Sequence, residues 1–147
     1  MAGALPPKGE VALSMETALL RVTRVSSVRV AAICSYDGIG IVSQAMAGTR
    51  GEDEIAAMSA EIGRAASLLL SVAADDALGV AVFGATNGML VIGDMGRGYV
   101  VAIADPTANL GLLRLEVETA AKELRAGLAR ARAEPLGPTA GRTGSAA

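Results

Sequence analysis

Apolar residues recur along the chain with two different spacings, which together predict an α+β domain of three helices and five strands. Spacings of three or four residues predict helices that begin at Ser14, after Thr49, and at Asp105 or Asn109. Runs of β-branched and alternating residues predict the strands. The order is α-β-β-α-β-β-β-α, with a mainly antiparallel sheet. The predicted strands are Val28 to Ser35, Ile39 to Gln44, Leu78 to Gly84, Met89 to Asp94 and Tyr99 to Ala104.

Residues with strong turn and capping preferences mark where these elements begin and end. Ser14 is a good N-cap for the first helix, and Thr49-Arg50-Gly51-Glu52 has capping-box spacing before the second. Asp37-Gly38 predicts a hairpin, because glycine supplies the positive φ that a tight turn needs. Asn87-Gly88 and Gly96-Arg97-Gly98 predict the two later hairpins.

The predicted second helix is apolar on two sides. Large residues at helical spacing form a stripe that we expect to be buried. A row of small residues, spaced by four, three and four, would let another helix backbone approach closely. Gly63 costs about 1 kcal/mol relative to Ala inside a helix, so its presence indicates a packing reason. The large stripe is Ile55, Met58, Ile62, Ala65, Leu69 and Val72, and the small row is Ala56, Ala60, Gly63 and Ser67.

Both faces of the predicted sheet carry apolar side chains, so both faces must be covered. In the third strand, for example, Val80 and Val82 alternate with Ala81 and Phe83. Five strands span about 24 Å and a helix is about 10 Å across, so a helix alone on one face leaves about half of it bare. Bare apolar areas of that size are rare on monomers. The pattern predicts a twofold homodimer in which the small row meets its own copy; the alternative is that the row packs on its own sheet.

Composition excludes several kinds of partner. The net charge is −2 with 19% charged residues and no basic block, which argues against nucleic acid, because phosphate binding needs clustered Lys and Arg. Cys34 is the single cysteine, so no intrachain disulfide can form. No apolar run approaches the roughly 20 residues needed to cross a bilayer, and the first residues lack the pattern of a signal peptide. We therefore expect a cytoplasmic protein that does not insert into membranes.

No set of residues has the pattern of an active site. The absence of histidine excludes a Ser-His-Asp triad, one cysteine cannot build a multi-cysteine metal site, and no GxxxxGK phosphate loop is present. Asp75-Asp76 is interpreted as a solvated turn and Cys34 as a small buried residue. Arg21, Arg24 and Arg29 form a modest basic group, interpreted as a solvated face with a partner contact as the alternative. The sequence predicts a protein that is not an enzyme and holds no cofactor or metal.

The two ends of the chain differ in composition from its middle. Residues 1–11 contain Pro6, Pro7 and Gly9 and little to bury, so we expect them to be loose. Residues 133–147 are rich in Pro, Gly, Ser and Thr, so we expect a disordered tail. The ordered domain is predicted over residues 12–132.

The element order and three segments resemble the roadblock/dynein light chain family, in its bacterial small-GTPase regulator type. The segments are ICSYDGIGIVSQ, DEIAAMSAEIGRAA and ADPTANLGLLRLEVETAAKEL, and the resemblance covers about Met15 to Leu128. It implies a five-stranded sheet in the order 2-1-5-4-3, with the first and last helices on one face and the middle helix on the other. It also implies dimers in which middle helices pair and third strands join two sheets. The implied dimer contacts are Ile55, Ala56, Ser59, Ala60, Gly63, Ser67, Leu78, Val80, Val82 and Phe83.

The function implied by this resemblance is regulation of a small Ras-like GTPase by a non-enzymatic homodimer. An activating role would not require a catalytic arginine from this chain, and a contribution from Arg21, Arg24 or Arg97 stays open. One alternative is a scaffold, like a dynein light chain, that joins other proteins without regard to nucleotide. Another is a small-molecule sensor with a pocket between helix and sheet, which the scarcity of polar lining disfavours.

Overall fold

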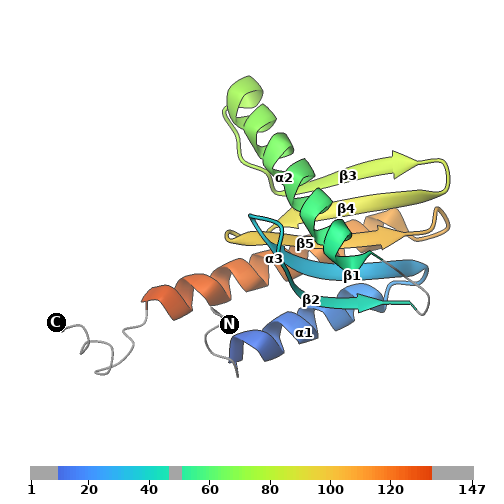
Figure 1. Ribbon diagram of the computed structural model, residues 1–147, viewed down its shortest axis with the longest axis horizontal. Helices are drawn as coiled ribbons and strands as arrows, with labels where there is room; N and C mark the ends of the chain where they lie inside the picture. The colour runs from blue at the N-terminus through green and yellow to red at the C-terminus, as the bar shows by residue number, and fades with distance from the viewer. Residues whose placement is uncertain (1–9, 47–50, 134–147) are drawn as a thin grey trace.

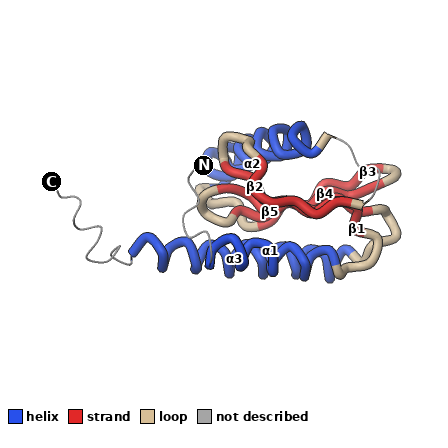
Figure 2. Tube along the Cα trace, turned by 60° about the horizontal axis from the view of Figure 1, so that its bottom comes forward, coloured by secondary structure: helices blue, strands red, loops and turns tan. Residues whose placement is uncertain are grey.

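The computed structural model describes residues 10–46 and 51–133, in which one sheet lies between two helical layers (Figures 1 and 2). Helices α1 and α3 lie side by side on one face of the sheet, and α2 crosses the other face. The helices are α1 (Glu10–Thr23), α2 (Glu52–Ala74) and α3 (Leu110–Ala133); the strands are β1 (Val28–Ser35), β2 (Gly40–Ala45), β3 (Val80–Ala85), β4 (Gly88–Asp94) and β5 (Gly98–Ala104).

The sheet is antiparallel throughout, in the order β2-β1-β5-β4-β3, as the family resemblance implied. Strand β1 has the predicted bounds, and β3 begins two residues later than predicted. Ala85 pairs with Gly88, so the β3–β4 hairpin turns on Thr86-Asn87, one residue before the predicted dipeptide. The sequence therefore predicted the number, order and type of the elements, with small errors at their ends.

The α1–α3 layer forms the larger of two hydrophobic clusters. Leu19 and Val22 on α1 and Leu113 and Val117 on α3 are fully buried against the sheet. Gly93 on β4 lets α3 approach closely, because a Cβ there would lie 3.1 Å from a methyl carbon of Val117. Burial of large aliphatic side chains stabilises this layer by about 1.5–3 kcal/mol for each residue.

Helix α2 begins and ends at residues with left-handed backbone. Gly51 is its N-cap, with φ 75° and no side-chain capping bond, so the helix begins later than the predicted capping box would place it. Thr49, the expected cap, lies outside the described residues. Glu52, Asp53 and Glu54 place negative charge in the positive first turn. The helix ends at Asp75, whose φ is 53°, and both Asp75 and Asp76 are exposed, which confirms the solvated turn.

Asn109 is the N-cap of α3, which decides between the two caps proposed from the sequence. The backbone N–H of Leu112 donates to Asn109 Oδ1 at 3.0 Å. Asp105 instead pairs with Arg29, whose Nε lies 2.5 Å from Asp105 Oδ1. Both ends of the predicted domain extend slightly, because α1 already includes residues 10 and 11 and α3 continues to Ala133. The remaining expectations about residues 1–9 and 134–147 lie outside the described residues.

Candidate interaction surface

The position of α2 on the sheet is set by Tyr99, a residue of β5 whose side chain is 1% exposed. A Cβ placed on Gly63 would lie only 2.5 Å from the Tyr99 ring, so only glycine lets the helix approach this closely. Ala56 and Ala60 are also buried against the sheet, as part of the same cluster. The small row therefore packs on its own sheet, and the expectation that it faces a second copy is wrong. The side chains thus buried inside one chain are Ala56, Ser59 and Ala60, together with the Gly63 backbone.

Most of the large apolar stripe of α2 points the other way, into solvent, although Ile62 is half-buried and packs against the core beneath the helix. The stripe was expected to be buried, but Met58 is 56% exposed, Leu69 66% and Val72 76%. Leu68 is also exposed. The reason is steric: once the small row lies over Tyr99, helical geometry turns the large residues to the opposite side. The second helix consequently presents a long apolar face that nothing within residues 10–46 and 51–133 covers.

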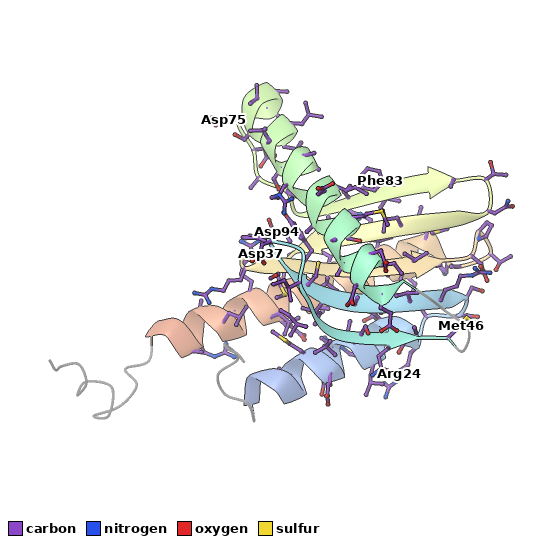
Figure 3. The ribbon with its side chains drawn as sticks, viewed as in Figure 1. Arg24, Asp37, Met46, Asp75, Phe83 and Asp94 are labelled. Atoms are coloured by element: carbon purple, nitrogen blue, oxygen red, sulfur yellow. The ribbon has the colours of Figure 1, made fainter. Side chains whose placement is uncertain are left out.

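Strand β3, at the edge of the sheet, extends this apolar surface on the α2 side. Phe83 is 40% exposed, and Figure 3 shows Phe83 beside α2. Val82 is 39% exposed but lies on the other face of the sheet, because it pairs with Val91 of the α1–α3 core. Phe83 pairs with Leu90 of β4, so the two side chains share the α2-facing side of the sheet. Of the other predicted contacts on this edge, Leu78 is buried and Val80 packs into the α1–α3 core. Ile55 and Ser67 on α2 are half-buried.

Helix α2 combines an apolar sequence with little burial. It is the one helix in the described residues that could cross a membrane by length and composition, and most of it is not buried in this chain. The prediction that no uninterrupted apolar run is long enough to cross a bilayer still holds, because Glu61 and Arg64 interrupt this helix. Because α2 already packs on a sheet through its small row, its other face calls for a covering partner. We name the exposed residues of this region the α2–β3 surface: Met58, Leu68, Leu69, Val72 and Phe83.

A polar cluster lies at the end of the sheet where the β1–β2 and β4–β5 turns meet, with Asp37 and Asp94 beside each other in Figure 3. The Tyr36 hydroxyl donates to Asp94 Oδ1 at 2.8 Å, and the Gly96 N–H donates to the same oxygen at 2.8 Å. Arg125 on α3 donates to the Asp94 carbonyl oxygen at 2.9 Å. Asp94 thus joins two turns and a helix.

The same cluster reaches α2. An Nη1 proton of Arg64 is donated to the carbonyl oxygen of Tyr36. Gly38, with φ 90°, lies against α2, since a Cβ there would be 3.1 Å from the Cα of Ala57. Burial, followed by the hydrogen bond to Asp94, raises the pKa of Tyr36 to about 12. Sequence reasoning found this hairpin but not the cluster, because its members are far apart in the chain.

The arginines and the cysteine considered in the sequence analysis lie at separate places in the structure. Arg21 bonds Glu123 across the α1–α3 layer and Arg29 pairs with Asp105, whereas Arg24 and Arg97 are exposed. The basic residues are therefore not gathered into one site. Cys34 is fully buried, and burial raises the pKa of its thiol to about 11, which confirms a small buried residue rather than a reactive one. Within residues 10–46 and 51–133, no three potential metal ligands come together.

Comparison with known proteins shows the fold. The structure is similar to MglB of Myxococcus xanthus, with a TM-score of 0.74 and 20% identity, over 86% of this chain and 95% of that one. It is also similar to the gliding protein MglB from Thermus thermophilus (TM-score 0.72, 18% identity, 86% and 96% of the two chains). A Roadblock/LC7 domain from Streptomyces avermitilis matches with a TM-score of 0.67 and 18% identity, over 80% and 96% of the chains. No family model and no curated protein matches the sequence. The chain has the roadblock fold.

Proposed function

We propose that this protein is a cytoplasmic, homodimeric regulator that binds a small Ras-like GTPase and modulates its nucleotide cycle or its location. The observation that carries the proposal is the roadblock fold, shared with MglB proteins over most of both chains. The sequence resemblance to bacterial GTPase regulators supports the same function.

The homodimer in this proposal is formed through the α2–β3 surface. This surface carries large exposed aliphatic residues on α2 and an exposed phenylalanine on an edge strand. A twofold axis beside β3 would place each α2 face against its copy and would cover apolar area that is rarely left bare. Relative to the contacts implied by the resemblance, Leu69 and Val72 replace the small row, and Phe83 keeps its place, whereas Val82 lies on the other face of the same edge strand.

The regulator would act by recognition and not by chemistry of its own. Switch segments of a small GTPase are ordered by the γ-phosphate and released after hydrolysis, so a surface that contacts them distinguishes the two nucleotide states. Binding preferentially to one state shifts the cycle toward it by the difference in affinity. No step in this proposal requires a catalytic residue from this chain.

The competing function is a scaffold that holds proteins together irrespective of nucleotide. The exposed apolar surface of α2 fits a scaffold equally well. An apolar surface indicates that some partner covers it, but it does not indicate which partner. The dependence of binding on nucleotide therefore separates the two functions.

The test is a titration of the purified full chain against Ras-like GTPases from the same organism. Each GTPase is loaded with GDP or with a non-hydrolysable GTP analogue, and the affinities are compared by calorimetry. We expect one GTPase to bind at least tenfold more tightly in one nucleotide state. Equal affinity in both states would favour the scaffold, and no binding to any of them would overturn the proposal.

A further inference from the structure

Strand β2 forms one edge of the sheet, at the opposite end from β3 (Figure 1). Within residues 10–46 and 51–133, the one strand that pairs with β2 is β1. Edge strands expose unpaired N–H and C=O groups, which proteins usually protect with charged residues, proline or a covering loop. The sequence of β2, GIVSQA, contains neither a charge nor a proline, and most of the strand is exposed. Ile39, Ile41 and Met46, in and beside the strand, are also exposed.

The pairing with β1 shows which backbone groups of β2 point outward. The Met46 N–H donates to the Arg29 carbonyl oxygen at 2.9 Å, so these two opposing residues form a hydrogen-bonded pair. Hydrogen-bonded and non-hydrogen-bonded pairs alternate along an antiparallel ladder. Gln44 therefore bonds to β1, whereas Ser43 and Ala45 direct their N–H and C=O groups away from it. These outward groups form a regular, unpaired ladder that another strand can join.

The surroundings of this ladder differ on the two faces of the sheet. On the α2 face, the Ser43 hydroxyl donates to Glu52 Oε1 at 3.0 Å, which places the acidic first turn of α2 beside the strand. In the described part of the chain, the three carboxylates of that turn form no ion pair, and Arg29 of β1 already pairs with Asp105. On the other face, Val42 packs against the α1–α3 core. A strand laid along β2 would meet carboxylates on one face and an apolar residue on the other.

We propose that the β2 edge binds an extended segment of a partner protein, in which basic residues alternate with apolar ones. The backbone of the segment bonds to Ser43 and Ala45, its basic side chains face the first turn of α2, and its apolar side chains lie beside Val42. Successive side chains of a strand point to opposite faces, so the alternation matches both faces at once. The site lies at the opposite edge from β3, so the homodimer of the proposed function would leave it free.

Peptide binding to the full chain, measured by fluorescence anisotropy, tests this site. The probe is a fluorescein-labelled peptide of alternating lysine and valine, of the same length as β2. One matched probe has the same sequence with methylated backbone nitrogens, which cannot donate hydrogen bonds, and another has glutamate in place of lysine. We expect the first peptide to bind about tenfold more tightly than either of the others, since each lacks several favourable contacts. Equal affinities for all three peptides would overturn the proposal.

A substitution at Ala45 tests the role of the outward backbone. Ala45→Pro removes one outward N–H, and an edge strand tolerates proline where that group is not bonded within the sheet. Ala45→Thr is the matched control, because it changes the side chain and keeps the N–H. We expect Ala45→Pro to weaken binding of the lysine–valine peptide by about fivefold or more, and Ala45→Thr to bind like the wild type. Unchanged affinity in Ala45→Pro would overturn the site.

Amide hydrogen exchange, followed by NMR on the wild type, locates the peptide and decides the matter even if Ala45→Pro fails to fold. We expect the peptide to slow exchange of the Ser43 and Ala45 N–H protons and to leave that of Gln44, which already bonds to β1, unchanged. Slowing along β3 instead would assign the peptide to the other edge and overturn the proposal. Protection of Ser43 and Ala45 without peptide would mean that another part of the chain or a second copy covers the edge, which would also overturn it.

Discussion

Tyr36 links two turns of the sheet through one hydroxyl group. Its hydrogen bond to Asp94 spans 58 positions in the chain, so no local pattern could have revealed it. The neighbouring Tyr99 ring lies 5.2 Å away, centroid to centroid, in a tilted arrangement that favours aromatic pairs. Local signals were enough to predict that Asp75 lies in a solvated turn and that Cys34 is buried in a strand, because both follow from the neighbouring residues in the sequence. Contacts such as Tyr36 to Asp94 depend on how the strands assemble.

The raised pKa of Tyr36 predicts a loss of stability at high pH. The folded protein keeps the phenolic proton up to about pH 12, whereas the unfolded chain releases it near 10.0. Between these values the unfolded state binds fewer protons, so the free energy of unfolding falls as the pH rises. We expect the melting temperature to decline as the pH rises above 10.0 and to decline less in Tyr36→Phe, because Tyr36 then no longer contributes, whereas Tyr99 and Cys34, whose pKa values burial also raises, still do. Identical pH profiles for the two proteins would contradict the linkage.

The orientation of α2 shows where sequence reasoning stops at the scale of an element. Both sides of this helix are apolar, one small and one large, so hydrophobic spacing alone cannot say which side meets the sheet. Tyr99 decides, because its ring leaves room only for the glycine and alanines of the small row. By contrast, β1 follows its β-branched run with the predicted bounds, and the Asp37-Gly38 turn follows from glycine's positive φ.

A side chain added at Gly63 tests how closely α2 packs on Tyr99. In Gly63→Ala the new methyl group would overlap the Tyr99 ring, so the helix must shift. We expect the free energy of unfolding to fall by about 1–2 kcal/mol, since overpacking costs more than the gain in helix propensity. Gly127→Ala in α3 is the matched control, because a Cβ there would meet only the end of the flexible Arg130 side chain, 3.8 Å away. Urea denaturation measures both; a stabilised Gly63→Ala would contradict the packing.

At the scale of the whole molecule, the two faces of the sheet are unequally covered. Two helices cover one face of the sheet, whereas α2 alone crosses the other and leaves β3 at an exposed edge (Figure 1). The argument from strand faces predicted this imbalance from the sequence, even though it assigned the wrong side of α2 to the partner. How much of each sheet face is covered depends on the number and width of the helices and strands, and the hydrophobic pattern predicts these well. Which residues make the contacts depends on how side chains fit together, and the hydrophobic pattern does not predict that.

The most direct test of this account is the molar mass of the wild type and two variants, measured by light scattering after size exclusion. Leu69→Asp places a charge on the exposed face of α2, and Ile39→Asp places one on the equally exposed β1–β2 turn. We expect the wild type to have at least twice the mass of one 14.7 kDa chain, Leu69→Asp to have half the wild-type mass, and Ile39→Asp to match the wild type. A wild type of single-chain mass, or a Leu69→Asp variant with unchanged mass, would contradict the homodimer formed through the α2–β3 surface.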